Sequence, residues 1–466
     1  MRDSAHIGRL ADNIAPVWNT ASIRNRWHIS LSRMMVGLVV LIAVGAALVQ
    51  ALLPADVRLG GEGRSIATVA IFVGSYLALA VGRIPGLRID RAGIALVGAS
   101  LMVASGALTL DEAYKAIDLD TITLLLGMMI IVASLRLSGF FSLATAWVMD
   151  RAKGPVILLV AVVATSGIFS AFLVNDAICL VLTPLVLKLT LSMGRKPTPF
   201  LLALAMASNI GSTATITGNP QNIMIGSFSH IPYTKFALTL GPVALAGLVV
   251  TAILILLLHR EQFAAGPRLA PPRLDVRVNR MLVIRALLAT AAVIALFFAG
   301  QAPAKAAIII GGLLLLTRRV KSWRVYAEID WSLLLMFAGL FIIVAGAERT
   351  LLTPARIAAV GGYHLDQVPV LSLVTAILSN IVSNVPAVLM MKPFVGSLQD
   401  PNTAWLVMAM ASTLAGNLTV LGSIANLIVV QKAAVSGVTI GFRDYFRVGA
   451  PLTIITLVIG TLWLWL

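Results

Sequence analysis

The chain has 466 residues, of which 59% are apolar and only 12% are charged, whereas a typical soluble domain carries about 25% charged residues. This composition excludes a soluble globular protein and a disordered chain, and the lone Cys179 excludes an internal disulfide or a cysteine metal cluster. The net charge of +16 resides in short loops between apolar runs, a pattern typical of inner-membrane proteins. We therefore expect an all-α polytopic membrane protein whose surroundings are the lipid bilayer, with no nucleic-acid partner.

Apolar runs of roughly the length that crosses a bilayer allow about ten to twelve transmembrane helices. Basic loops are expected on the cytoplasmic side, and this rule places the N-terminus inside and the C-terminus outside the inner (plasma) membrane. We expect a basic cytoplasmic N-terminus at 1–33, a first half at 34–258, a basic, proline-rich cytoplasmic linker at 259–281 and a second half at 282–466. The predicted simple spans are 34–53, 65–82, 92–108, 121–137, 235–258, 282–300, 303–317 and 330–347.

The apolar stretch 155–193 is too long for one span, and basic residues flank both of its ends. It is therefore either two full spans with a tight outer turn or a re-entrant hairpin that turns inside the membrane. Its middle reads Val174-Asn175-Asp176-Ala177. A carboxylate facing lipid there would cost at least ~3 kcal/mol, so a buried, water-accessible hairpin tip fits better.

The next apolar run, 198–228, is interrupted at 218–222 by Gly-Asn-Pro-Gln-Asn, which predicts a broken helix. Three blocks of the first half recur in the same order in the second half. The blocks that begin at Ile117, Asn175 and Met206 match blocks that begin at Ile329, Asn384 and Met410, at offsets of 212, 209 and 204.

The second hairpin, predicted at about 367–398, lacks the basic flanks of the first, so its ends are expected outside the cell. The two halves then have opposite orientations in the membrane. Inverted repeats that contain discontinuous helices are typical of secondary transporters, whose substrate site lies at the midplane between the repeats. A gene duplication without a transport role is the alternative.

The two hairpin tips and the two helix breaks are predicted to converge on one site. Breaking a helix frees backbone groups that must be satisfied by protein or by a wet cavity. Freed helix N-termini favour anions, and freed carbonyl groups suit Na⁺. The predicted substrate- and ion-binding residues are Asn175, Asp176, Thr217, Gly218, Asn219, Asn222, Ser383, Asn384, Gly422, Ser423 and Asn426.

Asp176 has no acidic counterpart in the second half, where Val385 stands. We predict that Asp176 couples proton movement to substrate movement; the alternative is a structural acid that never titrates. Lys392 is predicted either to pair with Asp176 or an anion, or to extend its amine toward the membrane surface. No catalytic motif or P-loop occurs, so we expect no enzyme activity, and ATP-driven transport would require a separate ATPase subunit.

Three motifs resemble the ion transporter superfamily, and within it the arsenite-permease and citrate-transporter-like group. FLVNDAICLVLTP at 172–184 and SNVPAVLM at 383–390 resemble the two hairpins of arsenite permeases. SNIGSTATITGNPQN at 208–222 resembles the helix break of citrate-transporter-like anion permeases. The resemblance, which covers about 65–460, implies an inverted-repeat fold, a homodimer and coupling to H⁺ or Na⁺. The binding residues it implies are Asn175, Asp176, Asn219, Asn222, Asn384 and Asn426.

We expect secondary active transport of a small inorganic oxyanion or neutral metalloid hydroxide, with arsenite or antimonite efflux favoured and H⁺ or Na⁺ as the coupling ion. No cofactor or metal is expected. One cysteine cannot supply three thiolates, so arsenite would bind as neutral As(OH)₃ through hydrogen bonds. The alternatives are a Na⁺/H⁺ antiporter, a citrate or dicarboxylate symporter, and a channel or non-transporting subunit. Asp176 would repel a multivalent carboxylate unless it were protonated.

Overall fold

The computed structural model describes residues 45, 61–81, 89–151, 154–263, 278–317, 319–352 and 364–466, and this part of the chain contains helices but no strand. Eight of the described helices are long and apolar enough to cross a membrane. The chain is therefore a multi-pass membrane protein. The predicted N-terminus 1–33, the span 34–53 apart from Gly45, and most of the linker 259–281 lie outside the described residues.

Helices occupy nearly all of the described first half. They are α3 (Gly61–Val81), α4 (Arg91–Ala104), α5 (Leu110–Ala116), α6 (Leu119–Ser138), α7 (Phe140–Arg151), α8 (Pro155–Phe172), α9 (Asn175–Ser192), α10 (Thr198–Ser212), the 3-10 turn η1 (Ile216–Gly218), α11 (Pro220–Ser229), α12 (Tyr233–Leu258) and α13 (Arg260–Phe263).

The described second half has a similar order of elements. They are α14 (Arg280–Phe298), α15 (Pro303–Leu315), α16 (Ser322–Tyr326), α17 (Trp331–Leu351), α19 (Val368–Val382), α20 (Asn384–Val395), α21 (Pro401–Ala415), the 3-10 turn η2 (Val420–Gly422), α22 (Ile424–Val435) and α23 (Phe442–Trp465).

The predicted spans within the described residues mostly coincide with observed helices. Eight of the described helices have the length of a span, and shorter apolar helices such as α4, α15 and α19 account for other apolar runs. The predicted span 92–108 ends early, because Gly106 adopts a positive φ of 72° and Thr109 then starts α5. The side chains of Thr109 and Glu112 form a capping box that fixes this start.

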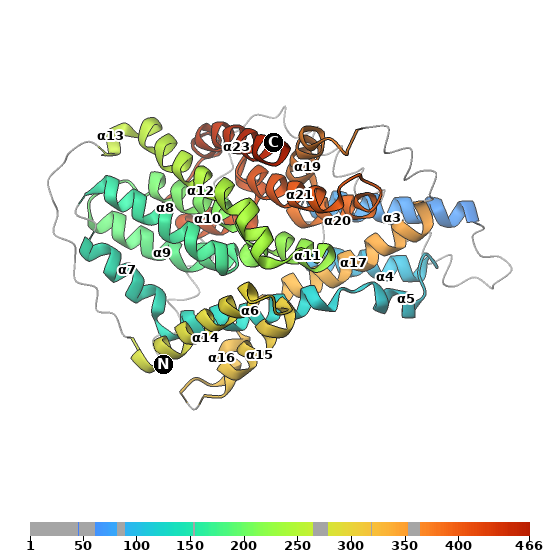
Figure 1. Ribbon diagram of the computed structural model, residues 1–466, viewed down its shortest axis with the longest axis horizontal. Coiled ribbons are helices and arrows are strands. Elements are labelled where there is room, and N and C mark those ends of the chain that lie inside the picture. The colour runs from blue at the N-terminus through green and yellow to red at the C-terminus, as the bar shows by residue number, and fades with distance from the viewer. Residues whose placement is uncertain are drawn as a thin grey trace, which may run out of the picture.

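The helices form two groups, as Figure 1 shows. One layer contains α4, α5, α6 and α14 to α17. The other contains α8 to α10, α12 and α19 to α23, and α11 runs between the two layers. Within the first layer α6 packs on α15 and α17 packs on α4; within the second layer α10 packs on α8 and α21 on α19.

Two glycines allow the helices of the first layer to approach closely. A Cβ atom on Gly127 of α6 would lie 2.5 Å from the Ala307 carbonyl carbon of α15, and one on Gly339 of α17 would lie 2.7 Å from that of Ala95 of α4. Small residues at helix contacts permit such packing in membranes. Gly339 follows Gly127 by 212 residues, and Ala307 follows Ala95 by the same number, so the two helix contacts match position by position.

Candidate substrate site

Eight helices, namely α3, α4, α9, α11, α17, α19, α20 and α22, contribute residues to the lining of one small cavity of about 30 Å³. Leu173 and Val174 separate α8 from α9, and Ser383 alone separates α19 from α20. The two 3-10 turns interrupt the α10–α11 and α21–α22 pairs. Polar and charged side chains that line the cavity are Arg91, Asn175, Asp176, Gln221, Ser383, Asn384 and Ser423.

Five predicted site residues therefore line this cavity: Asn175, Asp176, Ser383, Asn384 and Ser423. Other predicted site residues do not line the cavity but contact neighbouring parts of the protein. Thr217 shares a hydrogen bond of 2.8 Å with the Tyr233 hydroxyl. Gly218 lies against the Ser212 backbone and Gly422 against the Gly416 backbone, with no space for a side chain at Gly218.

Asn222 and Asn426 hold the two helix breaks together. The Asn222 amide nitrogen donates to the carbonyl oxygens of Ser212 (3.1 Å) and Thr215 (3.0 Å). The Asn426 amide nitrogen donates to those of Gly416 (2.8 Å) and Thr419 (3.2 Å). The second set follows the first by 204 residues at every position. These amides satisfy carbonyl groups that each break leaves without helical partners.

Asn209, near the end of α10, lies at the centre of a buried amide network. Its amide nitrogen donates to the side-chain oxygens of Asn417 and Asn426, both at 2.9 Å. Its side-chain oxygen accepts from Asn175 Nδ2 and from Ser423 Oγ, both at 3.0 Å. All four hydrogen-bonding positions of the Asn209 amide are thus used, and they tie the first hairpin tip to the second helix break.

Thr413 has the corresponding place on α21, 204 residues after Asn209. Its hydroxyl oxygen accepts from Asn219 Nδ2 and Gln221 Nε2, both at 3.1 Å. With its amide nitrogen turned toward the carbonyl oxygens of Ser412 and Gly422, the side chain of Asn384 also accepts from Gln221 Nε2 at 3.2 Å. Each helix break is therefore bonded to the opposite half of the chain, which holds the cavity walls in place.

Ser383, at the tip between α19 and α20, has an unusual backbone. Its φ is 80° and its ψ is 160°, a region that non-glycine residues rarely adopt and that costs of order 1–3 kcal/mol. Strain of this kind persists where surrounding structure imposes it, and it is often found at functional sites. The strained turn presents the Ser383 side chain to the cavity.

Asp176 also lines a second cavity, of about 100 Å³, together with Arg136, Glu328 and Asp330. Arg136 and Glu328 form an ion pair there. A third cavity, of about 500 Å³, lies between α6, α17 and α20 and contains Glu348. The linings of the second and third cavities include residue pairs separated by 212 positions, namely Val132 and Val344, Ala133 and Ala345, and Asp118 and Asp330.

Lys392 lies in the third cavity and does not line the one that contains the hairpin tips. Its Nζ is 3.7 Å from Glu348 Oε1 and 4.6 Å from the centre of the Phe228 ring. Of the predicted alternatives for Lys392, pairing with Asp176 is therefore wrong, because Glu348 from α17 and the aromatic face hold the amine elsewhere.

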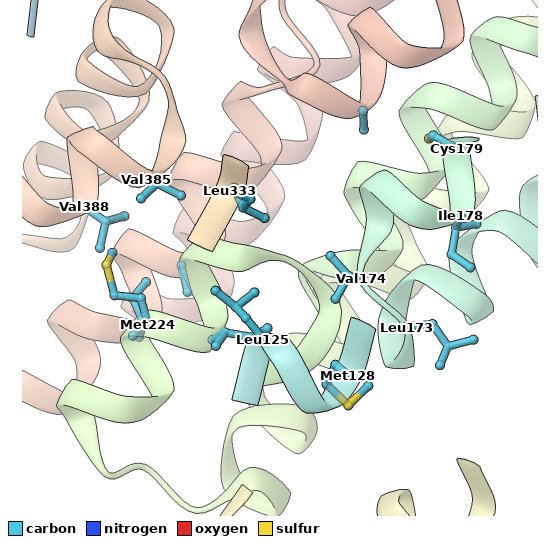
Figure 2. Close-up of a cluster of buried hydrophobic side chains, with 14 of the residues drawn as sticks. Leu125, Met128, Leu173, Val174, Ile178, Cys179, Met224, Leu333, Val385 and Val388 are labelled. Carbon is cyan, nitrogen blue, oxygen red and sulfur yellow. The ribbon is translucent and has the colours of Figure 1, made fainter. Parts of the chain in front are cut away.

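An apolar cluster lies next to the cavity, where the two layers meet. Figure 2 shows Leu125 and Met128 of α6 near Val174, with Cys179 of α9 farther along the same hairpin. Cys179 is fully buried in this hydrophobic core, as expected for a small packing residue.

Sequence reasoning did not identify Arg91, Asn209, Gln221, Thr413 and Asn417 as site residues. Asn209 and Thr413 occupy equivalent positions at the offset of 204, and this offset was the signal that could have found them. Nothing in the motifs or repeated blocks points to Arg91. The structure places it, partly buried, in the cavity with both hairpin tips.

Comparison with known proteins identifies the family of this chain. The family model described as "Citrate transporter" (CitMHS) matches residues 76–415. An uncharacterized transporter of Mycobacterium tuberculosis is 31% identical over 426 residues, which cover 86% of this chain and 98% of that protein. The silicon efflux transporter LSI3 of rice (Oryza sativa subsp. japonica) is 29% identical, with coverage of 84% and 96%.

A Dictyostelium discoideum protein that carries the name arsB is 26% identical over 80% of this chain and 87% of its own length. The solved structure of the YdaH transporter of Alcanivorax borkumensis has a TM-score of 0.52 at 15% identity and covers 93% of this chain and 97% of its own. This likeness extends to the fold alone. By the family match and the M. tuberculosis relative, the chain belongs to the citrate transporter (CitMHS) family of the ion transporter superfamily, and it is a secondary transporter, not an enzyme.

Proposed function

We propose that this protein exports a small neutral metalloid hydroxide, arsenite or antimonite, in exchange for protons. The observation that carries the proposal is the lining of the cavity between the hairpin tips. Amide- and hydroxyl-bearing residues line it together with apolar residues and Arg91, and Asp176 supplies the single carboxylate among the lining residues. As(OH)₃ both donates and accepts hydrogen bonds through its hydroxyl groups, and Asn, Gln and Ser side chains match these groups without adding charge.

The names of two relatives support a neutral hydroxide. One relative is named as a silicon efflux transporter and another as arsB. Silicic acid and arsenous acid are both uncharged polyhydroxy compounds near neutral pH. The single Cys179 is fully buried in the apolar core and does not offer arsenite a thiolate site. The proposed binding therefore relies on hydrogen bonds and not on thiolate ligands.

We further propose that the two halves are inverted repeats, each with a re-entrant hairpin (α8–α9 and α19–α20) and a broken helix. The matched glycine contacts, the matched asparagine bonds across the breaks and the matched cavity linings support this arrangement. In such a fold, the second and third cavities would be the access routes from the two sides of the membrane, with the substrate between them.

Asp176 is the proposed coupling residue, because it belongs to both the hairpin cavity and the second cavity. Substrate and proton would compete for this carboxylate, so that the bound proton leaves when substrate binds and returns after substrate release. A Na⁺/H⁺ antiporter is less well supported, since a cation site normally has more than one carboxylate. In the hairpin cavity Asp176 is the one acidic lining residue, and the second tip offers Val385 in the equivalent place.

A citrate symporter is the second candidate, and the description of the family model favours it. A citrate ion would have to enter a cavity of about 30 Å³ beside Asp176. The small volume of the cavity and the carboxylate of Asp176 both favour a solute that is smaller than citrate and uncharged.

We place the protein in the inner (plasma) membrane as a homodimer, with its N-terminus in the cytoplasm and its C-terminus outside. The distribution of basic loops along the chain supports this orientation.

Binding to the purified protein tests the proposed substrate. A ligand that binds the folded state raises its melting temperature by mass action, by an amount equivalent to about 2.7 kcal/mol at a ligand concentration of 100 Kd. We expect arsenite and antimonite to raise the melting temperature of the protein at neutral pH, and citrate and Na⁺ to leave it unchanged.

Ser383→Ala removes a hydroxyl group from the cavity and should reduce the arsenite-dependent shift. The matched control is Ser436→Ala, which removes an exposed hydroxyl at the end of α22 and should retain the full shift. Stabilisation by citrate but not by arsenite would overturn the metalloid proposal in favour of the citrate symporter.

A further inference from the structure

The cavity between the hairpin tips has two charged side chains in its lining, Arg91 from the start of α4 and Asp176 from the start of α9. The other polar side chains of the lining, such as those of Asn175 and Ser423, are neutral. The cavity thus combines one cation and one carboxylate with neutral hydrogen-bonding groups.

Both charged residues depart from the correspondence between the two halves. The position 212 residues after Arg91 is Pro303, and the position 209 residues after Asp176 is Val385. By contrast, Asn175 and Asn384, which both line the cavity, correspond at the offset of 209. Neither Arg91 nor Asp176 therefore has a charged counterpart in the other half of the chain, although both line the same cavity.

Arg91 is partly buried, and within the described ranges its guanidinium takes part in none of the ion pairs, which join Arg136 to Glu328, Arg349 to Glu112 and Lys392 to Glu348. The adjacent Asp90 directs a carboxylate oxygen to the backbone N–H of Gly93 at 2.8 Å, where it caps α4. A partly desolvated cation needs a compensating charge, and the carboxylate that shares its cavity is that of Asp176.

We propose that Arg91 is the counter-charge of Asp176, which keeps the cavity electrically neutral while Asp176 is ionised and thereby makes it select an uncharged substrate. The inference rests on the proposed function and assigns Arg91 as a specificity-determining residue of the same site. With both groups charged, a neutral hydroxide enters without creating net charge in a low-dielectric space. A citrate ion would leave the cavity with a large uncompensated negative charge.

The other charged groups near Asp176 lie in the second cavity. They are Asp330 and Glu328 ahead of α17 and Arg136 on α6. Glu328 is already paired with Arg136, so Asp330 is the remaining acid on that side. In the proposed arrangement, Arg91 offsets the charge of Asp176 from the hairpin cavity, on the other side from Asp330.

The test is the pH dependence of arsenite binding to purified wild type, Arg91→Gln, Arg91→Lys and Asp176→Asn. Because proton and substrate compete, binding by wild type should increase as pH rises through a midpoint. Removing the positive charge in Arg91→Gln makes the carboxylate hold its proton to higher pH, so the midpoint should move up by about one pH unit. Arg91→Lys keeps the charge and should keep the midpoint.

Asp176→Asn should bind arsenite without a pH midpoint, and adding Arg91→Gln to it should create no midpoint. The matched control is Arg324→Gln, which removes an exposed cation of α16 that lies outside the cavity lining and should behave as wild type.

An unchanged midpoint in Arg91→Gln would overturn the counter-charge role, while the proposed function would stand. Wild type that binds citrate, and loses citrate binding in Arg91→Gln, would also overturn it, because Arg91 would then be an anion ligand. Absence of arsenite binding by the wild type would instead overturn the proposed function itself.

Discussion

At the scale of single residues, the buried asparagines have two different roles, and their positions in the sequence do not show which residue has which role. Asn175 and Asn384 line the cavity, whereas Asn222 and Asn426 bond the carbonyl groups of the helix breaks. All four were predicted as binding residues on the same grounds. A sequence shows that an amide is near a break, but the direction of its side chain depends on which carbonyl groups the break leaves free.

The centre of the network, Asn209, provides a prediction about stability. Asn209→Leu preserves the approximate volume but removes one hydrogen bond from each of the polar side chains of Asn175, Asn417, Ser423 and Asn426. An unsatisfied buried polar group costs about 1–3 kcal/mol, so we expect the free energy of unfolding to fall by about 3 kcal/mol or more.

Denaturant or thermal unfolding in detergent measures this loss. The control Asn402→Leu changes an exposed asparagine near the start of α21, where the effect should be small. Equal stability of the two variants would contradict the role assigned to the network.

At the scale of elements, close helix contacts rely on matched glycines. Gly127→Ala and Gly339→Ala each place a Cβ atom within 2.7 Å of another helix backbone, so each should destabilise the protein by about 1–3 kcal/mol through overpacking. The control Gly312→Ala lies on α15, where an added Cβ meets nothing within 4 Å. Thermal unfolding of the three variants checks this, and a loss in Gly312→Ala as large as in Gly127→Ala would refute the explanation.

The start of α21 offers a pH-dependent prediction outside the membrane spans. Hydrogen bonds from the Thr403 hydroxyl and from the backbone N–H groups of Thr403 and Asn402 lower the pKa of Asp400 from its ordinary value. A carboxyl group with a lowered pKa in the folded state stabilises it above the unfolded pKa, and this contribution is lost as pH falls.

Asp400→Ala should therefore reduce stability by about 1 kcal/mol at neutral pH through loss of the helix cap. The difference from wild type should begin to shrink as pH falls below about 4 and be lost as pH falls through the lowered pKa of Asp400 in the folded state. Melting temperatures of both proteins across this pH range check the prediction, and a difference that persists at low pH would mean that the carboxylate is not its source.

Element boundaries show how far hydropathy alone can go. The long runs gave the spans 121–137 and 235–258 almost as α6 and α12 appear. The run at 92–108 was misjudged in length, because a positive-φ Gly106 and the cap at Thr109 end α4 four residues early. A hydropathy profile contains little information about local backbone geometry of this kind, so it could not predict where α4 ends.

At the scale of the whole molecule, the sequence predicted an all-helical membrane protein and the two interrupted helices because composition and glycine breaks act locally. The convergence of tips and breaks was predicted from the repeated blocks, and a shared cavity is present. The position of Arg91 could not be predicted, since it depends on how α4 packs against α17 in the other half of the chain. Long-range packing between halves decides which loop residues enter the site.

For the whole transport cycle, we propose that Asp176 couples substrate export to proton entry. The most direct measurement is arsenite flux in proteoliposomes under an imposed pH gradient, comparing wild type with Asp176→Asn. We predict that wild type accumulates arsenite on the acidic side against its concentration gradient, and that Asp176→Asn only lets arsenite equilibrate. Accumulation by Asp176→Asn equal to that of wild type, or flux by wild type that ignores the pH gradient, would contradict the account.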